Sequence, residues 1–405
     1  MGQPTVLGDL AILGGTPAFD ELRHVGRPNI GDRDRLLERI GDMLDRRWFT
    51  NDGPMVQELE QRFAEAHGVQ GAVAVANATL GLQLLARALD LRGEIVMPAF
   101  TFVATAHAFT WEGAWPVFAD IRRGDHNVDV DSVASAITER TAAIVGVHLW
   151  GRPCDVDGLG VVADAHGVPL ILDAAHALGV ATPSGPVGAG GRAEVLSLHA
   201  TKFVNSFEGG VVLSDDPALL DALRSLRNFG FADYDTVTSL GTNAKMPEVC
   251  AAMGLTCFES VEEFALVNEQ NFEAYRASLA GIPGVRLLEY DDVGTWNYQY
   301  VVLEIDEAVS GIERDSVVAG LHAEGVLARR YFYPGCHRHA PYARSERSWD
   351  LPVTDEVAAR VIVLPTGTAM DVAACSTVGQ LIGRLVTGGA PLGRRIAAAL
   401  GAAAT

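Results

Sequence analysis

The chain has 405 residues, of which 48% are hydrophobic and 20% charged, a globular composition that excludes a disordered chain, a collagen and a coiled coil. Its 31 basic and 51 acidic residues give a net charge of −20, which argues against non-specific binding to nucleic acid or to an anionic membrane. The length suggests two domains, or one large domain with a smaller partner.

The termini and cysteines give no sign of export or of a metal site. No run of about 18 apolar residues lacks a charge, so no membrane-spanning helix is expected. The first residues contain no basic segment followed by an apolar one, so no secretory signal is expected. The cysteines are scattered and form no CxxC pair: Cys154, Cys250, Cys257, Cys336 and Cys375. This favours reduced thiols in a cytoplasmic protein over disulfides or a zinc site.

Strands and helices alternate through the first half of the chain. Val56, Leu59 and Phe63 recur at helical spacing and predict an amphipathic helix that packs onto the block that follows. The predicted strands are Ala72–Ala76, Ile95–Met97, Trp115–Ala119, Ala143–His148, Pro169–Asp173, Val195–Leu198 and Gly210–Leu213. The predicted helices between them are Leu80–Leu89, Val103–Trp111, Val130–Ala136 and Val156–Ala165. This alternation predicts an α/β domain with a mainly parallel sheet covered on both faces.

The pattern changes after about Asn228. A loop over Phe229–Asn243 precedes a long helical pattern through Glu248–Leu279, a strand over Tyr298–Ile305 and a helix over Arg314–Glu324. We therefore predict an N-terminal arm over 1–30, a large domain over 31–245, and a linking helix with a small α+β domain over 246–405. The Ala-rich tail, Arg394–Thr405, is either a frayed helix or disordered and receives no function.

Three segments of the large domain place reactive groups at ends of strands. Asn77-Ala78-Thr79 lies between a strand and a helix, where free N–H groups and a hydroxyl suit a phosphate, although a simple helix cap explains the same residues. Asp173 ends an apolar strand, the edge where open α/β sheets bind ligands. Lys202 is the only lysine between Met1 and Arg224 and follows a strand among small and apolar residues. Desolvation would make its amine a nucleophile towards a carbonyl.

Together these segments match the needs of one cofactor. A phosphate cradle, an aromatic ring, a carboxylate at a strand end and a lysine are the groups that bind pyridoxal phosphate. Phe102 supplies the aromatic ring, although a core position at a helix start explains it equally well.

From about Gly14 to Tyr342 the sequence resembles the DegT/StrS-type sugar aminotransferases, which are fold-type I pyridoxal-phosphate enzymes acting on nucleotide-linked keto-sugars. The resemblance rests on Gly53-Pro54, Asn77-Ala78-Thr79, PAFTFVAT (98–105), GAWPVFAD (113–120), VHLWGRPCD (147–155), DAAHALG (173–179), SLHATK (197–202), EGG (208–210) and GTNAKM (241–246). It implies a three-layer large domain with a smaller C-terminal α+β domain.

The resemblance also implies roles for individual residues. Lys202 would form the Schiff base and move the substrate proton, Asp173 would pair with the pyridinium nitrogen, Phe102 would stack on the ring, and His176 would lie near its phenolic oxygen. The phosphate ligands would be Ala78 through its backbone, Thr79, Ser197 and Asn243, the last supplied by the neighbouring subunit of a homodimer. The loop RRYFYPGCH (329–337) resembles a substrate-side loop, with Arg330, Tyr331 and His337 as candidates and a positive surface loop as the alternative.

Lys202 argues against the branch of the family in which histidine replaces the lysine and the enzyme dehydrates the sugar. The chain has Ser-Leu-His where Ser-Phe-His is commoner, which should alter packing only. The implied reaction moves an amino group from L-glutamate to a dTDP-4-keto-6-deoxyhexose, with pyridoxamine phosphate as the intermediate form of the cofactor.

Three alternatives stay open on the sequence. A 3-keto-sugar is the main rival substrate, and a non-catalytic binding or regulatory protein is a rival of another class. A nicotinamide-dependent oxidoreductase has only Gly188-Ala189-Gly190-Gly191 in its favour, and no strand and helix frame that run.

Overall fold

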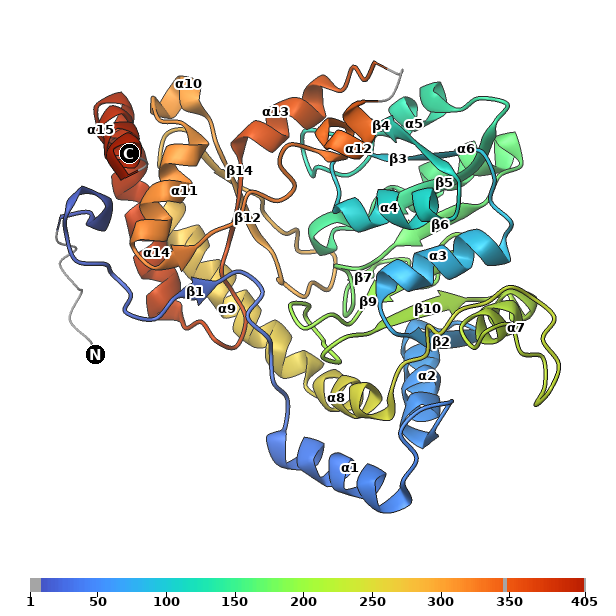
Figure 1. Ribbon diagram of the computed structural model, residues 1–405. Coiled ribbons are helices and arrows are strands. Elements are labelled where there is room, and N and C mark those ends of the chain that lie inside the picture. The colour runs from blue at the N-terminus through green and yellow to red at the C-terminus, as the bar shows by residue number, and fades with distance from the viewer. Residues whose placement is uncertain (1–8, 345–347, 404–405) are drawn as a thin grey trace.

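The computed structural model describes residues 9–344 and 348–403. Its large domain is built on a seven-stranded sheet with strand order β2-β10-β9-β6-β5-β3-β4 (Figure 1). The strands are β2 (Gly71–Val75), β3 (Glu94–Pro98), β4 (Trp115–Ala119), β5 (Thr141–Val147), β6 (Leu170–Asp173), β9 (Ala193–Ser197) and β10 (Gly210–Ser214). Only β10 runs antiparallel to its neighbours, so the predicted mainly parallel sheet is confirmed.

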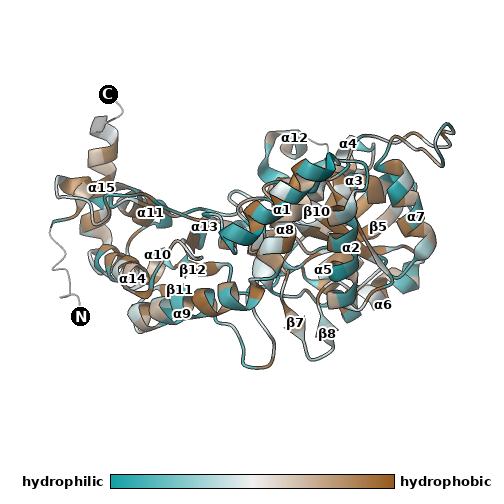
Figure 2. Ribbon diagram, turned by 90° about the horizontal axis from the view of Figure 1, so that it is seen from below, coloured by the Kyte–Doolittle hydropathy of each residue, from teal (hydrophilic) through white to brown (hydrophobic). Residues whose placement is uncertain are grey.

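Helices cover both faces of this sheet and form three layers. Val73 and Val75 of β2 point to one face, covered by α3 (Ala78–Ala88), α4 (Val103–Trp111) and α7 (Pro217–Leu226). Ala72 and Ala74 point to the other, because side chains alternate along a strand. That face is covered by α2 (Pro54–His67), α5 (Val130–Ala136), α6 (Val156–His166) and α8 (Glu248–Phe258). Figure 2 shows the apolar strands enclosed between these helices.

The second domain is smaller. Its three-stranded antiparallel sheet has the order β11-β12-β14, with β11 (Val285–Leu287), β12 (Val301–Ile305) and β14 (Val361–Leu364). Its helices are α9 (Val261–Leu279), α10 (Glu307–Ser310), α11 (Arg314–Ala323), α12 (Ala340–Ala343), α13 (Pro352–Arg360), α14 (Val372–Thr387) and α15 (Gly389–Ala403). Ile396 of α15 is buried in this domain's core, so the described part of the Ala-rich tail is a packed helix.

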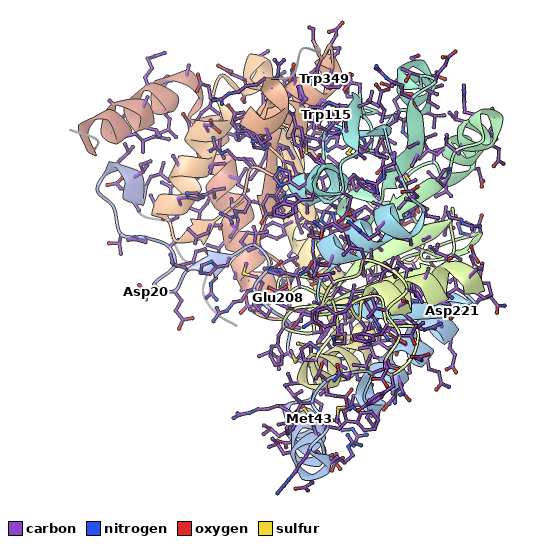
Figure 3. All side chains as sticks on the ribbon, turned by 45° about the vertical axis from the view of Figure 1, so that its right-hand side comes forward. Asp20, Met43, Trp115, Glu208, Asp221 and Trp349 are labelled. Carbon is purple, nitrogen blue, oxygen red and sulfur yellow. The ribbon has the colours of Figure 1, made fainter. Side chains whose placement is uncertain are left out.

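The described part of the N-terminal arm lies on the small domain. Strand β1 (Arg23–His24) pairs in parallel with β13 (Val326–Leu327), and Leu10 enters the small-domain core. Helix α1 (Arg33–Arg46) then lies at one end of the molecule, where Met43 enters the core of the large domain (Figure 3). A short hairpin, β7 (Ala181–Thr182) and β8 (Gly185–Pro186), completes the list of strands. Residues 1–8 of the arm and Ala404-Thr405 of the tail lie outside the described residues.

The prediction of one long helix over Glu248–Leu279 is wrong. The chain forms α8 and α9 and changes direction at Glu259 and Ser260. No glycine or proline marks the break. At the break the Glu259 carboxylate lies 2.6 Å from the Arg39 guanidinium of α1 and 2.7 Å from the Arg62 guanidinium of α2. We retain 31–245 and 246–405 as a proposed division into domains.

Candidate active site

Strands β5, β6 and β9 are parallel neighbours, so their carboxyl ends meet at one edge of the sheet. Asp173 is the last residue of β6, and the loop after β9 carries Lys202. The segment after β5 carries Trp150. A ligand at this edge would lie where open α/β sheets bind theirs.

Lys202 is half-buried where the small domain meets the large one. Its Nζ lies 3.3 Å from the hydroxyl of Tyr300, which directly precedes β12 of the small domain. Burial lowers the pKa of Lys202 from 10.5 to about 8, and the negative charge of Asp173 opposes that decrease. A much larger fraction of this amine is therefore unprotonated near neutral pH than of an exposed lysine.

Asp173 is held in place by two donors. Its Oδ2 accepts a hydrogen bond from the Thr105 hydroxyl at 2.8 Å, and its Oδ1 accepts one from the Ala175 N–H at 3.1 Å. Asp173 is 7% exposed, and a buried carboxylate needs partners for its charge. Thr105 lies on α4, so this helix positions the acid.

His176 is buried beside the same residues. Its Nδ1 accepts a hydrogen bond from the Trp150 N–H at 3.2 Å, which leaves the proton of the neutral ring on Nε2. Burial lowers the pKa of His176 well below 6.5, and the charge of Lys202 lowers it further. The lowered pKa and the accepted hydrogen bond together make the imidazole a neutral donor through Nε2. Its ring centroid lies 4.4 Å from that of Tyr300.

The turn between β2 and α3 brings a helix N-terminus to this edge. Asn77 caps the helix by accepting the Leu80 N–H at 2.9 Å, and Ala78 and Thr79 form its first turn, whose N–H groups lack intrahelical acceptors. A Cβ on Gly210 would lie 2.6 Å from the Ala78 nitrogen, so only glycine allows β10 to approach this closely. The cap predicted as the simpler explanation is present, and the same turn retains donors for an anion.

Two further residues that were predicted to bind the cofactor lie nearby. Phe102 is the residue before α4 and is 55% exposed, and its ring centroid lies 6.2 Å from that of Phe332. Ser197 ends β9 and is buried, and its Oγ accepts the His199 N–H at 3.4 Å.

Asn243 is exposed and precedes Ala244, whose carbonyl accepts the Ala76 N–H at 2.8 Å. It therefore lies beyond the same end of β2 as the α3 turn. Its role towards a neighbouring subunit stays a prediction.

The residues predicted for the substrate side differ in their exposure. Arg330 is exposed and pairs with Asp315 at 3.0 Å, and Tyr331 is half-buried and stacks on Phe332 at a centroid distance of 5.1 Å. His337 is 1% exposed, with its Nε2 3.0 Å from Asp355 Oδ1. The His337 ring thus contacts protein in this structure. All three assignments stay predictions.

The structure adds residues for which sequence reasoning proposed no role: Thr105, Trp150, Tyr300 and Phe332. Trp150 and Phe332 stack with centroids 5.2 Å apart and planes at 9°, and both lie near the His176 ring. Thr105 and Trp150 fall within motifs already noted, PAFTFVAT and VHLWGRPCD. Tyr300 comes from the small domain, and nothing in its local sequence indicates a contact with Lys202.

These residues fit pyridoxal phosphate. The site combines an amine of low pKa, a fixed carboxylate and an open helix N-terminus within one edge of the sheet. Among residues 9–344 and 348–403, no group of three or more histidine, cysteine or acidic side chains is placed to hold a metal ion.

Comparison with known proteins identifies the family. Residues 31–382 match the model of the DegT/DnrJ/EryC1/StrS aminotransferase family. The chain belongs to this family. It is therefore a pyridoxal-phosphate-dependent sugar aminotransferase of fold type I, as the sequence predicted. The run Gly188–Gly191 connects β8 to β9 with no helix after it, which removes the only feature that favoured a nicotinamide enzyme.

Individual relatives agree with this assignment. The chain is 34% identical over 362 residues to dTDP-4-amino-4,6-dideoxy-D-glucose transaminase of Escherichia coli, covering 87% of this chain and 95% of the relative. It is 30% identical to GDP-perosamine synthase of Vibrio cholerae, covering 84% and 93%. The crystal structure of DesI in the presence of its TDP-sugar product superposes with a TM-score of 0.92 at 52% identity, covering 96% of this chain and 98% of DesI.

Proposed function

We propose that this aminotransferase moves an amino group from L-glutamate to a dTDP-4-keto-6-deoxyhexose and yields the dTDP-4-amino-4,6-dideoxyhexose. The observation that carries the proposal is the 52% identity with DesI, whose structure was determined with a TDP-sugar product. The name of the Escherichia coli relative specifies the same class of amino-sugar.

Lys202 is proposed to hold and move the proton of the reaction. When bound, pyridoxal phosphate supplies an electron-accepting ring that stabilises negative charge on the adjacent substrate carbon. The Lys202 amine accepts the proton from the amino donor and later gives one to the sugar side. A pKa of about 8 suits both steps near neutral pH. Tyr300, 3.3 Å away, orients the amine.

Asp173 is proposed to keep a proton on the ring nitrogen, with Thr105 fixing its carboxylate. Ala78, Thr79 and Ser197 would hold the phosphate, and Phe102 would cover one face of the ring. His176 would donate from Nε2 on the phenolic-oxygen side. The aromatic side chains of Trp150, Tyr300 and Phe332 lie around the His176 ring and would limit the access of water to it.

The setting of the enzyme is also proposed. A homodimer would complete each site with Asn243 of the other subunit, and Arg330, Tyr331 and His337 would face the nucleotide sugar. We place the enzyme in the cytoplasm, because its five cysteines are free and buried. Among the described residues no helix is long and apolar enough to cross a bilayer. The product would serve glycosylation of a natural product, including an antibiotic, or of a surface polysaccharide.

A substrate panel tests the proposal. The enzyme is incubated with glutamate and separate 4-keto and 3-keto sugars linked to dTDP, UDP or GDP, and the products are assigned by NMR. The proposal predicts amination at C4 of the dTDP sugar as the fastest reaction. Preferred amination at C3, or a preference for another nucleotide, would contradict it.

A further inference from the structure

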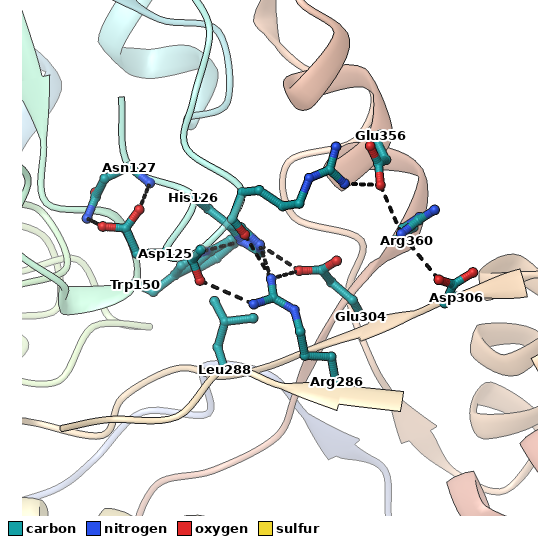
Figure 4. Close-up of polar contacts among 12 residues, drawn as sticks. Asp125, His126, Asn127, Trp150, Arg286, Leu288, Glu304, Asp306, Glu356 and Arg360 are labelled. Atoms are coloured by element: carbon teal, nitrogen blue, oxygen red, sulfur yellow. Dashed lines mark hydrogen bonds and ion pairs between the residues drawn. The ribbon is translucent and has the colours of Figure 1, made fainter. Parts of the chain in front are cut away.

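A buried histidine outside the proposed cofactor contacts links the two domains. His126 lies in the loop between β4 and α5 and is 0% exposed. Its Nε2 lies 2.8 Å from Oε1 of Glu304 on β12 of the small domain, and its Nδ1 lies 3.3 Å from the indole Nε1 of Trp150 (Figure 4). The histidine therefore bridges an acid of one domain and a tryptophan of the other.

The donors fix the state of this histidine. An indole N–H can only donate, so the Nδ1 of His126 is an acceptor, and the ring is neutral with its proton on Nε2. That proton points to the Glu304 carboxylate, 2.8 Å away, and Arg286, whose Nη2 lies 3.3 Å from the same His126 nitrogen, donates to the same carboxylate oxygen. Burial acts to raise the pKa of Glu304, but hydrogen bonds from His126 and Arg286 outweigh it, and the pKa is lowered. Glu304 thus stays charged and selects the tautomer that accepts from Trp150.

The loop also holds the backbone around Trp150. The Asn127 side chain accepts the Leu149 N–H at 3.2 Å and donates to the carbonyls of Arg152 and Pro153, both at 3.2 Å. Trp150 has a φ of 60°, a left-handed conformation that non-glycine residues adopt rarely. Contacts on both sides of the residue and on its indole maintain this conformation.

Trp150 in turn contacts His176 in two ways. Its backbone N–H donates to the His176 Nδ1 at 3.2 Å, and its ring stacks near the imidazole with centroids 6.1 Å apart and planes at 15°. The backbone contact leaves the His176 proton on Nε2. A shift of Trp150 would therefore change both the position and the tautomer of His176.

Strand β12 reaches the site at two points. Tyr300, Val302 and Glu304 alternate with the core residues Val301 and Leu303, so they share the face turned towards the large domain. Tyr300 contacts Lys202, and Glu304 contacts His126. The strand and the residue directly before it therefore contact the amine and, through His126 and Trp150, His176.

We propose that Glu304 and His126 are positioning residues for the aminotransferase reaction, which fix Trp150 and through it the orientation and tautomer of His176. The proposal rests on the proposed role of His176 beside the cofactor and is independent of which sugar is aminated.

The test compares three single variants and one double variant of the full-length enzyme loaded with pyridoxal phosphate. Glu304→Gln keeps the size of the side chain and removes its charge, and Trp150→Phe removes the indole N–H. Glu356→Gln is the control for the loss of a nearby carboxylate charge, because Glu356 pairs with Arg123 and Arg360 and no described hydrogen bond or ion pair links it to His126 (Figure 4). The double variant combines Glu304→Gln with Trp150→Phe.

The first readout is the circular dichroism of the cofactor's visible band without substrate, which reports the cofactor's surroundings. The second is the single-turnover rate with glutamate. We expect Glu304→Gln and Trp150→Phe each to change the band and to slow the turnover about five- to tenfold, as for the loss of a buried charge-assisted hydrogen bond. Glu356→Gln should match the wild type, and the double variant should be no slower than the slower single variant.

A purely structural role for Glu304 would lower the melting temperature and leave the band of the folded enzyme unchanged. Three results would overturn the proposal. The first is a circular dichroism band that Glu304→Gln leaves unchanged, and the second is a change in that band no larger than the one in Glu356→Gln. The third is a double variant whose turnover is slowed by the product of the two single effects. If Glu304→Gln gives no folded holoenzyme, Trp150→Phe decides: an altered band supports the proposal and a wild-type band overturns it. The substrate panel is separate, so failure of the proposed substrate leaves this result interpretable.

Discussion

At the scale of single residues, the environment of Lys202 determines the chemistry. Burial removes water from the ammonium form, and Asp173 only partly compensates for that loss. Tyr300 is the polar partner within 3.3 Å of Nζ. The free amine is the form that attacks an aldehyde, so the protonation of this residue should control how the apoenzyme takes up its cofactor.

The first prediction concerns pH. Uptake of pyridoxal phosphate by the apoenzyme should accelerate as pH rises through about 8, because the Lys202 amine loses its proton there. Asp173→Asn should move the midpoint to lower pH, since the carboxylate raises the pKa of Lys202. Stopped-flow absorbance over a pH series measures both. A midpoint near 10.5, the value of an ordinary lysine, would show that the amine is not desolvated.

The second prediction concerns Thr105. Thr105→Val removes the hydrogen bond to Asp173 Oδ2 and should raise the Kd for the cofactor about tenfold, the usual effect of losing a bond to a charged group. Thr110→Val is the control, because that hydroxyl donates to the Ala106 carbonyl of the same helix. Equilibrium titration of the apoenzymes measures the two affinities. Equal affinities for both variants would exclude a role for Thr105.

Some of these residues are predictable and others are not. An isolated lysine after a strand and an aspartate at the end of another are visible in the sequence, because both depend on local pattern. Tyr300 and Trp150 are not predictable, because their contacts in the site depend on the tertiary fold. Tyr300 is 98 positions from Lys202 in the sequence, and Trp150 is 26 positions from His176.

At the scale of elements, the junction of β2, α3 and β10 is closely packed. Gly210 lies against the first turn of α3, and any side chain there would push the helix away from β10. The donors of Ala78 and Thr79 would then move relative to Lys202, which follows the neighbouring strand β9.

The third prediction follows from this packing. Gly210→Ala should weaken cofactor binding by more than about tenfold and lower the melting temperature, because its Cβ would meet the Ala78 nitrogen at 2.6 Å. Gly160→Ala in α6 has open space around its Cβ and should retain both properties. Calorimetry and cofactor titration measure the effects. A Gly210→Ala enzyme with unchanged affinity would show that the α3 turn does not hold the phosphate.

The boundaries of helices and strands are also predictable where local sequence pattern sets them and not where tertiary contacts are involved. The strand over Trp115–Ala119 and the helices over Val103–Trp111 and Val130–Ala136 are as predicted, because apolar periodicity and flanking turns define them. The break between α8 and α9 is not predictable from periodicity, since no glycine or proline marks it and the Glu259 side chain at the break pairs with Arg39 and Arg62, which are distant in sequence.

At the scale of the whole molecule, the site lies between two domains and near an exposed loop. Asn243 belongs to a segment between α7 and α8 that includes the exposed residues Tyr234, Val237 and Leu240. We proposed that this segment reaches the site of a second subunit. The sequence suggested that assembly only through the family resemblance, because no periodic pattern reports which surfaces meet.

The fourth prediction tests the shared site by subunit mixing. Lys202→Ala and Asn243→Ala homodimers should each have little activity. Dissociated and reassociated together, they should recover up to about a quarter of wild-type activity, because half of the random dimers contain one intact site of two. An activity assay after mixing measures the recovery. If Asn243 acts within its own chain, no mixed dimer contains an intact site and the activity stays at the level of the parents.

The most direct test of the account is to locate the covalent link to the cofactor. The chain contains only two lysines, Lys202 and Lys245, so the outcome is unambiguous. The holoenzyme is treated with sodium borohydride and digested, and the peptides are analysed by mass spectrometry, with Lys202→Ala as the control. The account predicts a phosphopyridoxyl group on the peptide that contains Lys202 and none in the variant. A label on Lys245, or an unlabelled Lys202 in a coloured enzyme, would contradict it.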